Sequence, residues 1–192
     1  MIQKSETRKE EIVRTAEALF KKKGYSAVTM RDIAQAMGIK AASLYNHIQS
    51  KQQILSDIII QIGEQFTEGM AEIVAAENIT SIEKLERIIK LHVQITMENP
   101  SKMATMNNDW MHLEGKLDYY LQLRRNYEES FRQILKQGIE KGELKAVNPE
   151  IILFSILSTL RSLYLWIPKR EDIIKENLLG KLSQVMLTGV TA

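Results

Sequence analysis

The residues best suited to chemistry lie between Thr29 and Lys51, where two short helical stretches are joined by a tight turn at Gly38. Small side chains at the start of the second stretch would let a helix backbone approach base edges closely, and polar side chains beside them could form hydrogen bonds with those edges. A helix-turn-helix has this spacing because its second helix must enter a major groove about 12 Å wide. The pattern predicts contact with duplex DNA, and an ordinary helical hairpin is the alternative.

Ten residues make up the predicted DNA-contacting set. Lys40 and Asn46 are long or polar enough to reach base edges, whereas Lys51 and the donors at the helix start of Thr29 are expected at a phosphate strand. The full set is Thr29, Arg31, Lys40, Ala41, Ala42, Ser43, Tyr45, Asn46, His47 and Lys51.

The charge distribution supports this prediction. Residues 1–51 carry ten Lys and Arg against five acidic residues, a net charge of +5, whereas the whole chain of 192 residues carries only +2. A basic head on a mildly acidic body is typical of a phosphate-binding module attached to a second part. Solvated helix charge is the alternative explanation.

Other chemistry is poorly supported. The chain has no Cys, which excludes disulfides, thiolate zinc sites and cysteine nucleophiles. Asp109 and His112 are three residues apart and could reach one ion, but no third ligand follows at matching spacing, so we expect no metal and no other cofactor. No Gly-rich phosphate loop or HExxH motif stands out, which argues against an enzyme. The charged N-terminus, MIQKSETRKEE, lacks the apolar core of a signal peptide, and we expect a cytoplasmic protein.

Helices must position these residues. Capping boxes such as Thr7 with Glu10, apolar residues at helical spacing and few Gly or Pro predict an all-α fold of about nine helices with no strand. The expected helices begin and end near residues 7–24, 29–37, 41–48, 50–76, 80–99, 101–114, 117–141, 148–166 and 171–187.

The stretch TMRDIAQAMGIKAASLYNHIQSKQQIL resembles the DNA-binding domain of the TetR family of bacterial transcriptional repressors, over about residues 7–55. The matching positions are Thr29, Ile33, Ala34, Gly38, Leu44, Tyr45, His47, Ser50, Lys51 and Ile54 or Leu55. Two positions depart from the family pattern. Lys40 replaces a usual capping Ser, which costs on the order of 1 kcal/mol at the recognition helix, and Ile48 replaces a usual Phe.

This resemblance implies a helix-turn-helix domain at residues 1–51 and a helical effector-binding and dimerisation domain at residues 52–192. It also implies a homodimer whose last two helices pair with their copies. The apolar run IILFSILSTLRSLYLWI agrees, because something must cover it. A membrane span is the rival, but 17 residues are few and Arg161 interrupts them, so we expect no membrane. The predicted interface residues are Ile174, Leu178, Leu182 and Val185.

The effector is the least defined partner. Thioethers and aromatic rings can line an adaptable apolar cavity, with an arginine at its edge for a carboxylate or phosphate, although such residues are often plain core. The candidates are Met103, Asn107, Trp110, Met111, Tyr120, Arg124, Tyr127, Arg161 and Trp166. The body also resembles, more loosely, family members that sense acyl-CoA thioesters, and a hydrophobic drug-like molecule is the other candidate.

Together these features predict a ligand-responsive transcriptional repressor that binds a palindromic operator as a dimer and leaves it when an effector binds. The alternative is a helical-bundle interaction protein or enzyme that does not bind DNA.

Overall fold

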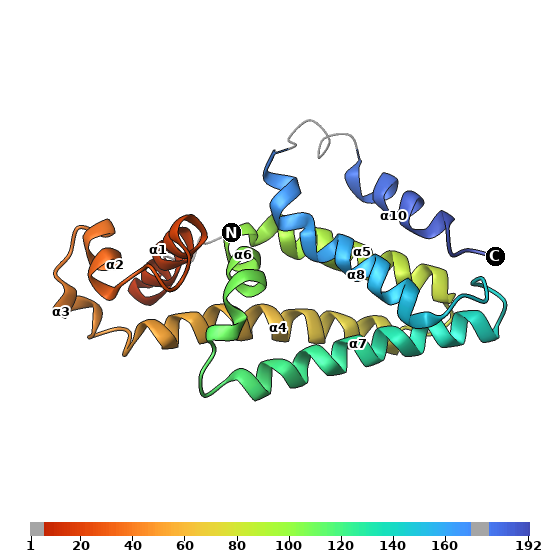
Figure 1. The fold of residues 1–192 in the computed structure, drawn as a ribbon, viewed down its shortest axis with the longest axis horizontal. Helices are drawn as coiled ribbons and strands as arrows, with labels where there is room; N and C mark the ends of the chain where they lie inside the picture. The colour runs from red at the N-terminus through yellow and green to blue at the C-terminus, as the bar shows by residue number, and fades with distance from the viewer. Residues whose placement is uncertain (1–5, 170–176) are drawn as a thin grey trace. The chain divides into compact units, whose positions relative to one another are not determined.

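The computed structural model describes residues 6–169 and 177–192. These residues form nine α-helices and two short 3-10 helices, with no strand apart from one isolated bridge between Leu144 and Thr191 (Figure 1). The α-helices are α1 (Arg8–Lys23), α2 (Met30–Ala36), α3 (Ala41–Leu44), α4 (Lys51–Ala75), α5 (Ser81–Glu98), α6 (Pro100–Asp109), α7 (Leu117–Glu140), α8 (Pro149–Trp166) and α10 (Leu178–Thr188), and the 3-10 helices are η1 (Trp110–His112) and η2 (Ile167–Lys169). The predicted all-α fold is confirmed.

Local sequence signals fix where several helices start. Capping boxes in which the Thr hydroxyl and the acidic side chain three residues later exchange hydrogen bonds with the backbone open α1 at Thr7, α2 at Thr29 and α5 at Thr80. Asn148 caps α8 ahead of a proline in its first turn. These caps satisfy backbone N–H groups that a helix start otherwise leaves without partners.

The recognition helix is shorter than predicted. The sequence pattern suggested a helix over residues 41–48, but α3 ends at Leu44 and residues 45–47 form a turn. Lys40 occupies the N-cap position and makes no side-chain capping hydrogen bond, since an ammonium group cannot accept one. One turn of helix without a cap depends on the tertiary contacts of Leu44 and Ile48, both of which are buried.

The chain divides into two compact units. The first, called the head unit below, comprises residues up to Ile62 together with Ser101–Tyr120, and the second, the body unit, comprises Gly63–Pro100 and Leu121–Ala192. The head unit is therefore larger than the predicted domain of residues 1–51, because it also contains residues 52–62 and the segment Ser101–Tyr120. Helices α4 and α7 each contribute residues to both units.

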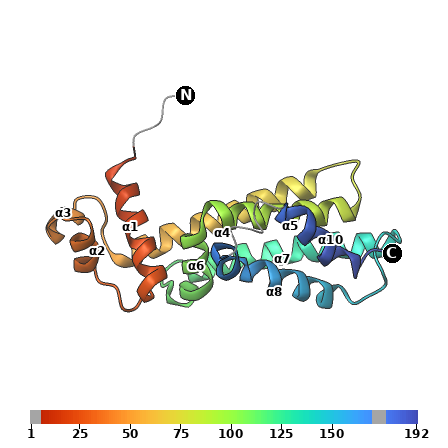
Figure 2. The same cartoon turned by 90° about the horizontal axis from the view of Figure 1, so that it is seen from above.

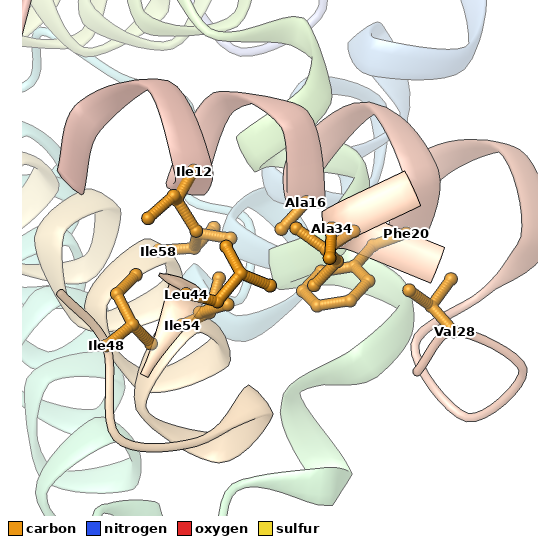
Figure 3. Packing of buried hydrophobic residues seen from close by; sticks show 10 residues of the cluster. Ile12, Ala16, Phe20, Val28, Ala34, Leu44, Ile48, Ile54 and Ile58 are labelled. Atoms are coloured by element: carbon orange, nitrogen blue, oxygen red, sulfur yellow. The ribbon is translucent and has the colours of Figure 1, made fainter. Parts of the chain in front are cut away.

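The head unit has its own apolar core. Figure 3 shows Ile12, Ala16 and Phe20 of α1 facing Ala34, Leu44, Ile48 and the first turns of α4. All the core side chains are at most 2% exposed, which excludes water from the centre of the unit. The core members are Ile12, Ala16, Phe20, Val28, Ile33, Ala34, Leu44, Ile48, Ile54 and Ile58.

In the body unit α5 packs against both α8 and α10 (Figures 1 and 2). At the end of α7, a Cβ atom added to Gly138 would come within 2.8 Å of side chains of Leu144 and Ser81, so only glycine fits there. The chain end is tied to the same place, since Lys145 N donates to Val190 O at 2.8 Å and Ala192 N donates to Glu143 O at 3.3 Å.

The segment Pro149–Lys169 is long and apolar enough to cross a membrane, with a mean hydropathy of 1.6, and 44% of that window is buried inside the protein. A core helix of a soluble protein has the same properties, so this is weak support for the membrane alternative.

Candidate nucleic-acid interface and effector site

The residues predicted to read bases, together with Tyr45 and His47, which were predicted at a phosphate strand, gather on the solvent side of α3 and the turn after it. Leu44 and Ile48 point into the head core (Figure 3), which turns the intervening side chains outward. Ala41 is half-buried, and the exposed side chains are Lys40, Ala42, Ser43, Tyr45, Asn46 and His47. Small residues on the helix, followed by amide, imidazole and phenol groups, form a surface on which a backbone can approach base edges while polar groups reach them.

The donors of Thr29, which the sequence predicts at a phosphate strand, are already used inside the protein. Its N–H and hydroxyl both donate to Asp32 Oδ2, at 2.8 and 2.5 Å, and its hydroxyl accepts from Asp32 N at 3.2 Å. These hydrogen bonds to Thr29 hold the pKa of the Asp32 carboxyl below its usual value, so the group is ionised. The Asp32 carboxylate already accepts the hydrogen bonds of the donors at the start of α2, and its negative charge would repel a phosphate there. Arg31, another residue of the predicted DNA-contacting set, is exposed on the same helix.

Lys51 is directed into the protein. Its Nζ donates to Tyr25 O at 2.9 Å and to Val28 O at 2.8 Å, and it lies 4.1 Å from the centroid of the Tyr25 ring. Burial lowers the pKa of Lys51. Two of its three donors are used inside the head unit, where they hold the loop between α1 and α2.

Tyr25 joins this loop to the segment 101–120 of the same unit. Its ring stacks on His112 with a centroid distance of 5.5 Å, and its hydroxyl donates to Gln52 Oε1 at 2.5 Å. Gln52 Nε2 in turn donates to His112 O at 2.7 Å, and Tyr25 N donates to Asp109 Oδ1 at 3.4 Å. The sequence gives no sign of this cluster, because Tyr25 and Asp109 are 84 residues apart.

Two carboxyl groups are buried where segment 101–120 meets the rest of the head unit. Burial raises the pKa of Asp109, which the N–H of Tyr25 partly offsets. Burial also raises the pKa of Glu17, against the opposing effect of Lys102, whose Nζ lies 3.9 Å from Glu17 Oε1. Lys102 additionally donates to Gln61 at 2.7 Å. The head unit therefore holds segment 101–120 with polar contacts as well as apolar ones.

The predicted effector residues divide between the two units. Met103, Asn107, Trp110, Met111 and Tyr120 belong to the head unit, whereas Arg124, Tyr127, Arg161 and Trp166 belong to the body unit. In the head unit the rings of Trp110 and Tyr120 lie 6.1 Å apart. Asn107 donates to the carbonyl of Met103 within its own helix, and Met111 lies on the surface with 59% of its area exposed.

In the body unit Glu128 joins two of the predicted residues. Arg161 donates to Glu128 Oε1 at 2.6 Å and Arg124 donates to the same oxygen at 3.2 Å. These arginines hold the pKa of Glu128 below its usual value, although its burial opposes the shift. Trp166, by contrast, is 40% exposed at the end of α8.

Sequence reasoning placed His92 on the apolar face of its helix and favoured a hydrogen-bonded histidine over a metal ligand, and the structure shows this residue in the body core. His92 and Thr96 are buried on α5, His92 Nε2 lies 2.8 Å from the Tyr127 hydroxyl, and the His92 ring lies 4.5 Å from that of Phe66. The one sequence signal was a histidine on an otherwise apolar helix face. Among the residues that the structure describes, no three acidic, His or Cys side chains are grouped so that they could hold a metal ion.

The predicted interface residues have different environments. Val185 is 76% exposed, Leu182 is half-buried and Leu178 is buried inside the protomer, so the expectation that Leu178 faces a partner is wrong. Ile174 lies outside the described residues. The sequence prediction placed the apolar run of α8 in the interface but named none of its exposed apolar side chains as interface residues, and Phe154 is the most exposed of them at 71%. Those side chains are Ile151, Phe154, Leu165 and Trp166.

Two family profiles match the chain. Residues 12–58 match the profile described as bacterial regulatory proteins, tetR family, and residues 78–190 match the tetracyclin repressor-like C-terminal domain. The first match contains the whole helix-turn-helix, and the second covers more than half of the chain.

Individual relatives agree with these profiles. The HTH-type transcriptional repressor KstR2 of Rhodococcus jostii strain RHA1 is 28% identical over 141 residues, which cover 72% of this chain and 69% of the relative. The nucleoid occlusion factor SlmA of Vibrio vulnificus strain YJ016 is 27% identical over 158 residues, which cover 80% of each.

Solved structures share the fold. The ketosteroid transcriptional regulator KstR2 of Mycobacterium tuberculosis has a TM-score of 0.90 at 20% identity, over 99% of this chain and 97% of that one. The TetR family transcriptional regulator PfmR of Thermus thermophilus has a TM-score of 0.80 at 27% identity, over 92% of this chain and 97% of that one. With an exposed readout surface on its head unit and both family profiles matched, the chain belongs to the TetR family of bacterial transcriptional regulators, and it is a ligand-responsive DNA-binding regulator rather than an enzyme.

Proposed function

We propose that the protein is a cytoplasmic repressor that binds a palindromic operator as a homodimer and leaves it when a small apolar molecule binds the body unit. The observation that carries the proposal is the exposed surface of α3 and its following turn, where Lys40, Ser43 and Asn46 stand free of the head core. Two such surfaces related by a two-fold axis would read two half-sites in inverted order.

The exposed apolar side chains support the dimer. Ile151, Phe154, Leu165 and Trp166 on α8 and Val185 on α10 would all be costly to leave in water, and a second copy would cover them. The effector is proposed to be an acyl-CoA or another hydrophobic molecule. An apolar effector is supported by the structural neighbour KstR2, which is described as a ketosteroid transcriptional regulator, and by the aromatic core around Tyr127.

The test is DNA binding by the purified full-length protein. Duplexes are selected from a random library and then titrated by fluorescence anisotropy at several salt concentrations, with the spacing between half-sites varied. We expect affinity that falls steeply with salt and that is lost when the inverted half-sites are moved by half a helical turn. Selection of no sequence at all, or of single half-sites without symmetry, would refute the proposal.

A further inference from the structure

A small polar cluster lies inside the apolar core of the body unit. His92 and Thr96 occupy one face of α5, a single turn apart, and are 4% and 0% exposed. The His92 ring is surrounded by aromatic rings from two other helices, at centroid distances of 4.5 Å to Phe66 of α4 and 5.8 Å to Tyr127 of α7. Aromatic rings are usual in a protein core, whereas the polar side-chain atoms of His92 and Thr96 are not.

Two atoms of this cluster lack hydrogen-bond partners. His92 Nε2 is satisfied by the Tyr127 hydroxyl at 2.8 Å, whereas His92 Nδ1 and Thr96 Oγ1 are buried without any partner. A buried polar atom without a partner lowers stability, and a valine or a phenylalanine at these positions would avoid the cost. Polar atoms kept in a core at a cost indicate a partner that is not part of the chain.

The protonation states define what that partner must offer. Burial first, and then the charge of Arg161, lower the pKa of His92 to about 3, so the imidazole is neutral and carries one proton. Burial raises the pKa of Tyr127, so its hydroxyl keeps its proton. If the Tyr127 hydroxyl donates to His92 Nε2, the Nδ1–H group is the one donor of these two side chains that lacks an acceptor. The opposite arrangement would leave both the Tyr127 proton and the Nδ1 lone pair unused, so the first is favoured.

We propose that His92 Nδ1–H and the Thr96 hydroxyl donate hydrogen bonds to the uncharged carbonyl oxygen of an apolar effector, whose neighbouring carbon atoms contact Phe66 and Tyr127. This inference rests on the proposed function, since it assigns the part of the effector that enters the body core. Two donors suit a carbonyl oxygen, which has two lone pairs. A carboxylate fits less well, because the nearby Arg161 is already paired with Glu128 at 2.6 Å and a buried second anion would lose its hydration.

Arg161 marks the outer end of the same region. Its charge acts on both His92 and Tyr127, and its side chain is 34% exposed. The region therefore runs from two unpaired donors in the core to a solvated guanidinium. An effector with a carbonyl at its inner end and a polar or anionic group at its outer end would match both ends.

The first test compares two molecules of almost the same shape. Cyclohexyl methyl ketone carries the carbonyl, and isopropenylcyclohexane replaces its oxygen with a methylene group. We expect calorimetric titration of the full-length protein to show the ketone binding about tenfold more tightly, as expected for two hydrogen bonds in a buried site. Thr96→Val should reduce this preference several-fold. The control is Thr105→Val, because Thr105 is equally buried but its hydroxyl is satisfied by Ser101 O at 3.2 Å.

The second test uses the protein without any ligand. Replacing an unpaired hydroxyl with a methyl group should raise the melting temperature of Thr96→Val by about 2–4 °C, whereas Thr105→Val should lower it. Should Thr96→Val fail to fold, the nitrogen-15 shifts of His92 in the unmodified protein decide the matter. We expect a protonated Nδ1 and an unprotonated Nε2 across pH 5 to 8, and a change at Nδ1 when the ketone is added.

Equal binding of the two molecules, or a proton on Nε2, would overturn the inference. These outcomes are separable from failure of the proposed function, which is measured by release of a DNA duplex in anisotropy. Ketone binding without DNA release would support the carbonyl site and refute the effector role. DNA release by apolar molecules with no preference for a carbonyl would support the effector role and refute the carbonyl site.

Discussion

Replacing Lys51 with methionine separates two roles for this side chain, an internal one and a phosphate contact. The variant keeps the aliphatic stem and removes the ammonium group, which bonds to Tyr25 O and Val28 O and lies over the Tyr25 ring. Tyr25 O still accepts from Val28 N at 3.2 Å, so only the Val28 carbonyl loses its partner. One hydrogen bond from a charged donor contributes about 1.5–3 kcal/mol and the cation–π contact about 0.5–1 kcal/mol.

Because Lys51 is half-buried, we take a total near the lower end, about 2 kcal/mol, which corresponds to a melting temperature lower by about 4–8 °C for a chain of this size. The assay is thermal unfolding followed by circular dichroism, together with DNA affinity measured below the transition. Lys40→Met is the matched control, since Lys40 is exposed on the readout surface and should lose DNA affinity and about one unit of salt slope without losing stability. An internal role for Lys51 is refuted if Lys51→Met has the same melting temperature as the unmodified protein. The same variant would then show the weaker salt dependence of DNA affinity that is expected for Lys40→Met.

Three further predictions concern the readout surface, the dimer and the head unit. Asn46→Ala should cost about 1–3 kcal/mol at one base pair only, measured across single-base variants of the selected operator, and an equal loss at every position would contradict a base-reading role. Phe154→Asp, at a 71% exposed apolar position of α8, should yield monomers in light scattering, whereas Val74→Asp, at an exposed position of α4, should leave the dimer intact. The third prediction uses Glu17, whose pKa is raised by burial above its ordinary 4.5 against the effect of Lys102. Since the folded state binds this proton more tightly than the unfolded state, Glu17 should add stability as the pH falls through that raised pKa toward the ordinary 4.5, and urea unfolding of Glu17→Gln should show a smaller gain.

Local patterns predicted the helices well because the groups that determine them are close in sequence. Thr7, Thr29 and Thr80 each lie three residues before the carboxylate that completes their capping box, and all three boxes form. Comparison with the family pattern identified Lys40 as a missing cap, but the local pattern still extended the recognition helix to residue 48. The energetic cost of the missing cap was recognised, whereas its consequence for length was not.

The contacts that the sequence could not predict are long-range or depend on direction. Segment 101–120 joins the head unit through Tyr25, Asp109 and His112, and nothing in a local pattern pairs residues so far apart. The position of Lys51 matched the family pattern, but a motif specifies a residue type and not where its ammonium group points. Thr29 differs, because its partner Asp32 is only three residues away and the effect of that carboxylate on the expected anion site could have been read from the sequence.

The tie between the end of the chain and the turn after α7 affects how the protein can be handled. Glu143 accepts from Ser81 N at 2.6 Å with its side chain and from Ala192 N at 3.3 Å with its carbonyl, so the turn fastens the start of α5 and the last residue together. Cutting off residues 190–192 would release the far end of α10 while leaving every helix intact. The hydrogen bonds of Val190 O and Ala192 N therefore hold the helix that carries Val185 against the turn after α7, and their loss should loosen that helix.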